Sequence, residues 1–201
     1  IRDSSVTGVQ TCALPIFEIG SFPTKKVAGG YDFVGDNYDS SGEHGSPTPV
    51  PDFDPLDPAP NGHGSHVAST IAGYGVLTNG LTFSGAYDAT LQPSRFQVAP
   101  GVAPEATLYA VKVFGNNGST SGGIVVSALE WVLDPNGDGN FTDHLDVVNL
   151  SLGGTFEPTS ASDVEGKSID LLTQSGVAVV VAAGNNGNVD RKSTRLNSSH
   201  T

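Results

Sequence analysis

The sequence has no methionine among its 201 residues and one cysteine, Cys12. A single cysteine excludes a disulfide within the chain. The lack of a starting methionine leads us to expect that this is not an intact translation product. No apolar run approaches the roughly 20 residues that span a bilayer, so the sequence predicts no membrane-spanning helix.

Basic residues are also scarce, with 9 Lys and Arg against 21 Asp and Glu, for a formal net charge of -12. This balance argues against nucleic acid and anionic membranes as partners. It suits a soluble exported protein or one that binds cations, although solubility alone is the simpler explanation. The length predicts one domain with a substantial core, and the 26 Gly and 13 Pro predict many tight loops.

Both ends differ from the body of the chain. Residues 1–16 show no helical or strand periodicity, and residues 191–201 are a polar tail that holds three of the nine basic residues. Both resemble translated sequencing-adapter reads, so we expect a non-native leader, a domain over residues 17–190 and a non-native tail. Genuine flexible termini are the alternative.

Strand and helix patterns alternate through the body. Apolar periodicity predicts strands and helices in the order expected of a mostly parallel sheet covered on both sides, a three-layer α/β sandwich. Segment 177–183 is apolar throughout, which predicts burial on both faces. Segments 36–60 and 75–100 carry little periodicity and are expected to be loops. The expected strands are residues 27–33, 107–114, 147–152 and 177–183, and the expected helices are 63–74, 122–133 and 161–175, the last burying Val164, Ile169, Leu171 and Leu172.

The segment NGHGSHVASTIAG, residues 61–73, places His63 between two glycines at the start of a small-residue helix. A neutral imidazole held there suits proton transfer near pH 7. The segment resembles the histidine motif of subtilisin-like serine proteases, the subtilases, which implies that His63 is the general base. Ser65 stands where the family more often has Thr. A packing role for His63 is the alternative, and the pair His63 and His66 does not have zinc spacing.

Three further segments resemble the same family in the right order. Segment 146–154, DVVNLSLGG, implies a wall of the primary specificity pocket at Ser151, Leu152 and Gly153. Segment 114–120, FGNNGST, implies a strand that pairs with extended substrate through Gly118, Ser119 and Thr120. Segment 182–185, AAGN, implies the oxyanion-hole role for Asn185. Without the resemblance these are glycine turns after strands, and an Asn tolerates such turns.

The other two members of the family's triad are missing from the expected places. The aspartate is expected on a strand before residue 27, followed by Ser or Thr and Gly, and Asp3 lies in the foreign-looking leader. The serine is expected after Asn185 at a Gly-Thr-Ser helix start, a setting that Ser198 and Ser199 lack. We therefore expect about 170 residues from the centre of a catalytic domain, inactive alone. We also expect the His63 and Asn185 side chains to face one cleft.

Residues 134–143, DPNGDGNFTD, form a separate motif. Oxygen ligands at Asp134, Asn136 and Asp138, with Gly directly after the third, have the spacing of an EF-hand calcium loop. Leu145 stands where the bidentate Glu belongs, so Asp143 would have to substitute. A plain acidic loop is the alternative.

The resemblance implies a secreted serine endopeptidase that acts on polypeptides through an acyl-enzyme, and we expect it to be a monomer. The spacing of residues 134–143 adds an expected structural calcium, and the acidic charge leads us to expect no nucleic-acid or membrane partner. A non-catalytic peptide- or calcium-binding relative is the second hypothesis. Nucleotide binding is a remote third, because no glycine-rich phosphate loop opens a helix.

Overall fold

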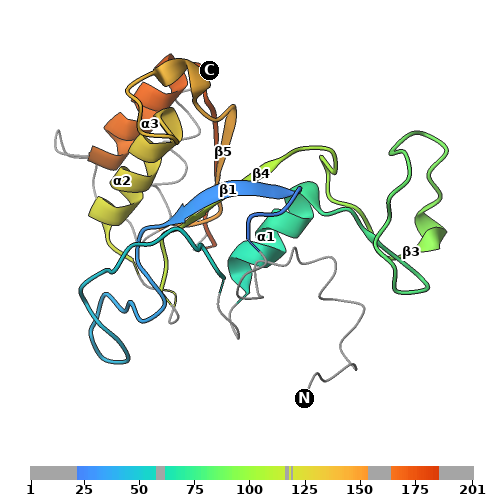
Figure 1. Ribbon diagram of the computed structural model, residues 1–201, viewed down its shortest axis with the longest axis horizontal. Coiled ribbons are helices and arrows are strands. Elements are labelled where there is room, and N and C mark those ends of the chain that lie inside the picture. The colour runs from blue at the N-terminus through green and yellow to red at the C-terminus, as the bar shows by residue number, and fades with distance from the viewer. Residues whose placement is uncertain (1–21, 58–61, 116–117, 119, 154–163, 186–201) are drawn as a thin grey trace. The chain divides into compact units, whose positions relative to one another are not determined.

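The computed structural model describes residues 22–57, 62–115, 118, 120–153 and 164–185. The chain divides into two compact units, residues 1–119 and 120–201. Their described helices and strands follow the expected alternation (Figure 1).

The first unit contains one parallel strand pair and the helix that begins at His63. Strand β1 (Val27–Asp32) pairs in parallel with β4 (Leu108–Lys112). Helix α1 (His63–Ala72) lies beside this pair, because Ala68 packs against the buried Val27 together with Leu108 and Ala110 (Figure 1). The sheet thereby fixes the helix that carries the predicted base.

The segment between α1 and β4 contains more regular structure than its sequence predicts. Strands β2 (Val76–Leu77) and β3 (Phe96–Val98) form an antiparallel pair, and a short 3-10 helix (Pro93–Arg95) precedes β3. The expectation of loop alone over residues 75–100 was therefore wrong. The pair is held by the ring of Phe83, which lies edge-on to Phe96 and Tyr87 at centroid distances of 5.2 and 5.1 Å. Of these contacts, the one that reaches β3 joins Phe83 to Phe96, 13 positions further along the chain, and such a contact leaves no periodic pattern in the sequence.

The second unit is built on the parallel pair of β5 (Val147–Leu150) and β6 (Ala178–Val181). Helices α2 (Gly122–Leu133) and α3 (Val164–Gln174) pack against each other beside it (Figure 1). A 3-10 helix (Phe141–Asp143) lies between α2 and β5. The core comprises Val125, Leu129, Val132, Leu133, Leu150, Ile169, Leu172 and Val177.

Two expectations about burial in this unit were wrong. Val164 and Leu171 of α3 are 56% and 50% exposed, while Ile169 and Leu172 carry the buried face. In β6, Val179 and Val181 pack against the core, but Val180 between them is 54% exposed. Val147 of the neighbouring β5 is 60% exposed. The described core of this unit covers one face of the strand pair, so an unbroken apolar run did not produce burial on both faces.

Candidate active site

His63 is the first residue of α1 and is exposed. The preceding Gly62 has φ 57°, a left-handed conformation that favours glycine. Gly62 provides no side chain to cap the helix, and the first turn of α1 has no acidic residue. The bond that usually stabilises a helix start therefore has to come from elsewhere in the chain.

That bond comes from Asp57, which sequence reasoning missed. Its Oδ2 accepts a hydrogen bond from the backbone N–H of Ser65 at 2.6 Å. At the opposite end of α1, the N–H groups of Val102 and Ala103 donate to the carbonyls of Thr70 and Ile71 at 3.1 and 2.7 Å. Both helix ends are therefore tied to loops.

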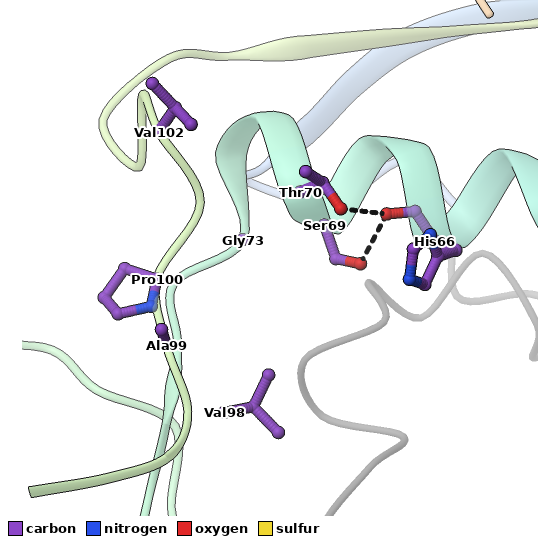
Figure 2. A pocket seen from close by; sticks show the side chains of 8 residues that line it. All are labelled: His66, Ser69, Thr70, Gly73, Val98, Ala99, Pro100 and Val102. Carbon is purple, nitrogen blue, oxygen red and sulfur yellow. Dashed lines mark hydrogen bonds between the residues drawn. The ribbon is translucent and has the colours of Figure 1, made fainter. Parts of the chain in front are cut away.

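A pocket of about 340 Å³ lies along α1 beyond His63 (Figure 2). The hydroxyls of Ser69 and Thr70 both donate to the carbonyl oxygen of His66, at 3.0 and 2.9 Å. The wall opposite these hydroxyls is apolar, because it is formed by residues 98–100 and Val102. The lining residues are His66, Ser69, Thr70, Gly73, Val98, Ala99, Pro100 and Val102.

The predicted oxyanion residue Asn185 lies four residues after the end of β6 and is exposed. Gly184 before it has φ 83°, so the chain turns sharply at the carboxyl end of the strand. The N–H of Ala182 donates to the carbonyl of Leu150 and extends the pairing of β6 with β5 to that point. His63 and Asn185 belong to different units, so their expected cleft stays a prediction.

The predicted substrate-binding residues follow β4 and β5. Ser151 accepts a hydrogen bond from the Asn149 amide at 2.8 Å, Leu152 packs against the core, and Gly153 is exposed. Gly118 has φ 75° in a turn closed by its N–H and the carbonyl of Gly115. Thr120 is half-buried, and Ser119 lies outside the described residues.

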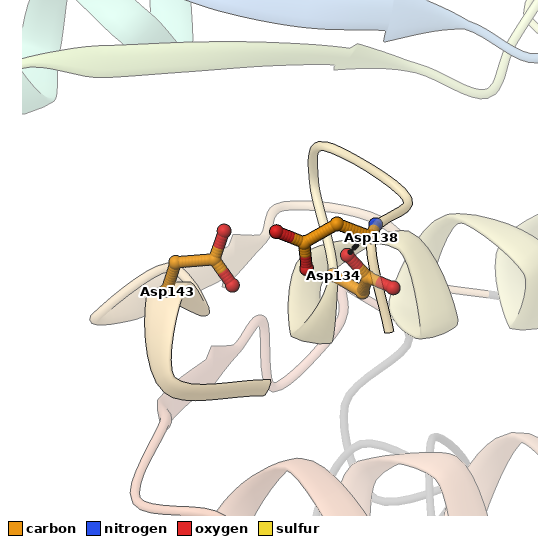
Figure 3. A group of neighbouring side chains, drawn as sticks. All are labelled: Asp134, Asp138 and Asp143. Carbon is orange, nitrogen blue, oxygen red and sulfur yellow. Dashed lines mark hydrogen bonds between the residues drawn. The ribbon is translucent and has the colours of Figure 1, made fainter. Parts of the chain in front are cut away.

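The predicted calcium loop brings its three carboxylates together. One oxygen from each of Asp134, Asp138 and Asp143 lies within 4.8 Å of the others (Figure 3). Gly139, directly after the third predicted ligand, has φ 80°, the sharp turn that the spacing requires. The Asn136 amide nitrogen donates to Asp143 at 2.6 Å and to Asp138 at 3.2 Å. The donor set is all oxygen and fits a hard divalent cation, provided that Asn136 turns its amide oxygen inward.

A second feature that the sequence did not reveal is the buried pair of Asp32 and Lys112 at the carboxyl ends of β1 and β4. Lys112 Nζ lies 2.7 Å from Asp32 and 3.0 Å from the exposed Asp36. Burial opposes the charge of Lys112, but its hydrogen bonds to Asp32 and Asp36 and the attraction of their charges together outweigh this effect and raise the pKa of Lys112. Nearby, burial and the charges of Asp52 and Asp36 raise the pKa of Asp54.

Comparison with known proteins identifies the family. The model of the Subtilase family matches residues 26–200. The chain belongs to the subtilase family. It is 34% identical over 170 residues to Subtilisin DY from Bacillus licheniformis, covering 84% of this chain and 44% of that protein. It is 39% identical over 127 residues to Subtilisin Savinase from Lederbergia lenta, covering 63% and 36%.

The solved structure of Sphericase supports the same fold. It matches with a TM-score of 0.52 and 25% identity, covering 81% of this chain and 40% of that one. The expected subtilisin-like α/β fold is thus confirmed. The chain spans less than half the length of these relatives.

Among the helices that the structure describes, none has both the length and the apolar character that a membrane span requires.

Proposed function

We propose that this chain supplies the general base and an oxyanion donor of an exported serine endopeptidase that cleaves polypeptides. The observation that carries the proposal is the exposed His63 at the anchored start of α1, in a subtilase whose sequence has the family's histidine motif. Its imidazole would take the proton from a serine hydroxyl and return it to the leaving amine.

Asn185 is proposed to stabilise the oxyanion, because it follows a strand end at a sharp turn and is exposed. An amide N–H bond strengthens as negative charge develops on the substrate oxygen. The turns at Gly118 and Gly153 are proposed to line the substrate path, together with Ser119, Thr120, Ser151 and Leu152. The protein is proposed to act as a monomer.

The 201-residue chain alone is proposed to be inactive, because its sequence has no serine or aspartate in the family's triad settings. A fluorophosphonate probe should label it no more than a heat-denatured sample. Stoichiometric labelling would show that a reactive serine is present.

The positive half of the proposal needs a chain of family length that carries both missing residues. In that chain His63→Ala should lose nearly all peptide hydrolysis, and Asn185→Ala should lower kcat with little change in KM. His66→Ala, one turn further along α1 and exposed, is the matched control and should keep most activity. Equal losses in His63→Ala and His66→Ala would reject His63 as the base.

We further propose that the loop of Asp134, Asn136, Asp138 and Asp143 binds structural calcium. The convergence of three carboxylates and the left-handed Gly139 support this site. If the protein proves to be a non-catalytic relative, calcium binding and peptide binding at the Gly118 and Gly153 turns would remain as its functions.

A further inference from the structure

Asp57 reaches the helix start from the loop before it. Ser65 is the third residue of α1, and its N–H is one that an N-cap side chain normally satisfies. Gly62 occupies the N-cap position without a side chain, and Asp57 Oδ2 takes the bond at 2.6 Å. A carboxylate at this end of a helix also interacts favourably with the positive end of the helix dipole.

Gly64 gives an independent sign that the carboxylate is closely fitted. A Cβ added at Gly64 would lie 3.3 Å from Asp57 Oδ2 and 3.6 Å from its Cγ. Any side chain there would press on the carboxylate that holds the turn. The glycine after the histidine is therefore explained by Asp57 packed over the helix start.

The rest of α1 is held as well. The N–H of Gly101 donates to the carbonyl of Gly73, and a Cβ at Gly101 would lie 2.6 Å from the Ala72 nitrogen. With this end fixed and Ala68 packed against Val27, the first turn is the part of α1 whose position depends on Asp57.

We propose that Asp57 is a positioning residue for His63: by bonding the Ser65 N–H it fixes the first turn of α1 and thus where the imidazole lies. The proposal rests on the proposed role of His63 as general base. Asp57 acts through the backbone of this turn, so its effect is on the orientation and order of His63.

The test uses NMR on the 201-residue chain. Asp57→Ala should speed exchange of the Ser65 amide about fivefold or more, the size expected for a lost helix cap, and should shift the His63 ring resonances. Asp57→Asn keeps an acceptor oxygen and should stay within about twofold of the original exchange rate. Glu43→Gln removes one exposed charge elsewhere in the unit and should change neither signal.

Unchanged Ser65 exchange and unchanged His63 resonances in Asp57→Ala would overturn the proposal. So would an effect of Asp57→Asn as large as that of Asp57→Ala. If Asp57→Ala does not fold, Gly64→Ala decides, because its added methyl would press on the carboxylate at 3.3 Å and should speed exchange of the Ser65 amide. Unchanged exchange of that amide in Gly64→Ala would then overturn the proposal. If His63 were not the base, hydrolysis by the family-length chain would show it while these resonances still responded to Asp57.

Discussion

The ammonium of Lys112 and the carboxylate of Asp32 lie 2.7 Å apart at register partners of strands β1 and β4. Asp32 has no solvent exposure, and its Oδ1 also accepts the N–H groups of Val34 and Gly35 at 2.8 and 2.7 Å. One side chain thus joins the two strands and turns the chain after β1, where the loop leading to His63 begins.

Lys112→Met should destabilise the chain by about 3–5 kcal/mol, because it leaves the Asp32 charge buried without its partner. Urea unfolding followed by circular dichroism measures the change. Asp36→Asn is the matched control: Asp36 bonds the same ammonium, but its side chain is 74% exposed, so its loss should cost about 0–1 kcal/mol. Similar losses of stability in both variants would contradict a special role of burial. The double variant Asp32→Asn with Lys112→Met should lose less stability than Lys112→Met alone, because it leaves no buried unpaired charge.

The same pair predicts a loss of stability at high pH. The pKa of Lys112 lies above its ordinary value of 10.5 in the folded chain, since the hydrogen bonds and charges of Asp32 and Asp36 together outweigh burial. Its stabilisation is therefore fully present below pH 10.5 and is lost as the pH rises through the folded pKa. The Tm measured from pH 9 to 12 should fall more steeply for the original chain than for Lys112→Met. Parallel plots of Tm against pH would show that Lys112 is not the group that causes the loss.

Lys26 should have the opposite effect on how stability changes with pH. Its ammonium donates to the carbonyls of Pro104 and Ala106 at 2.6 and 2.7 Å and lies 4.3 Å from the Tyr74 ring centroid. Burial lowers its pKa, and the charge of Glu105 only partly opposes this effect. Between the lowered folded pKa and 10.5 the unfolded chain binds more protons, so this lysine makes stability rise with pH.

Lys26→Met should remove that rise, measured as the difference in Tm between the original chain and the variant from pH 7 to 10.5. Lys25→Met is the neighbouring control and should leave the slope unchanged. A slope unaffected by Lys26→Met would mean that another group titrates in this range.

Local patterns predicted the elements better than the contacts between them. The bounds of α2 match because its apolar residues recur at helical spacing and Asp134 and Pro135 follow it. Asp57 has no such signal, since it caps a helix whose N-cap residue lies five positions further on. The partnership of Asp32 and Lys112 crosses 80 residues and follows only from the register of β1 with β4. The exposed face of β6 shows that apolar composition alone does not reveal which face a neighbour covers.

The calcium proposal predicts a metal-dependent gain in stability. If the oxygens of Asp134, Asp138 and Asp143 bind the ion in the folded chain only, calcium at 100 times its Kd should add about 2.7 kcal/mol and raise Tm. Asp138→Asn should remove most of this rise, because it takes one charge from the centre of the loop. It should also raise stability without calcium, since the three carboxylates repel one another.

Asp170→Asn is the matched control, because it removes one exposed charge from α3 in the same unit without touching the loop. It should leave the calcium-dependent rise in Tm intact. Magnesium at the same concentration tests for simple charge screening, and it should give a smaller rise because it demands a tighter octahedral site. An equal rise in Asp138→Asn and Asp170→Asn would place the effect outside this loop.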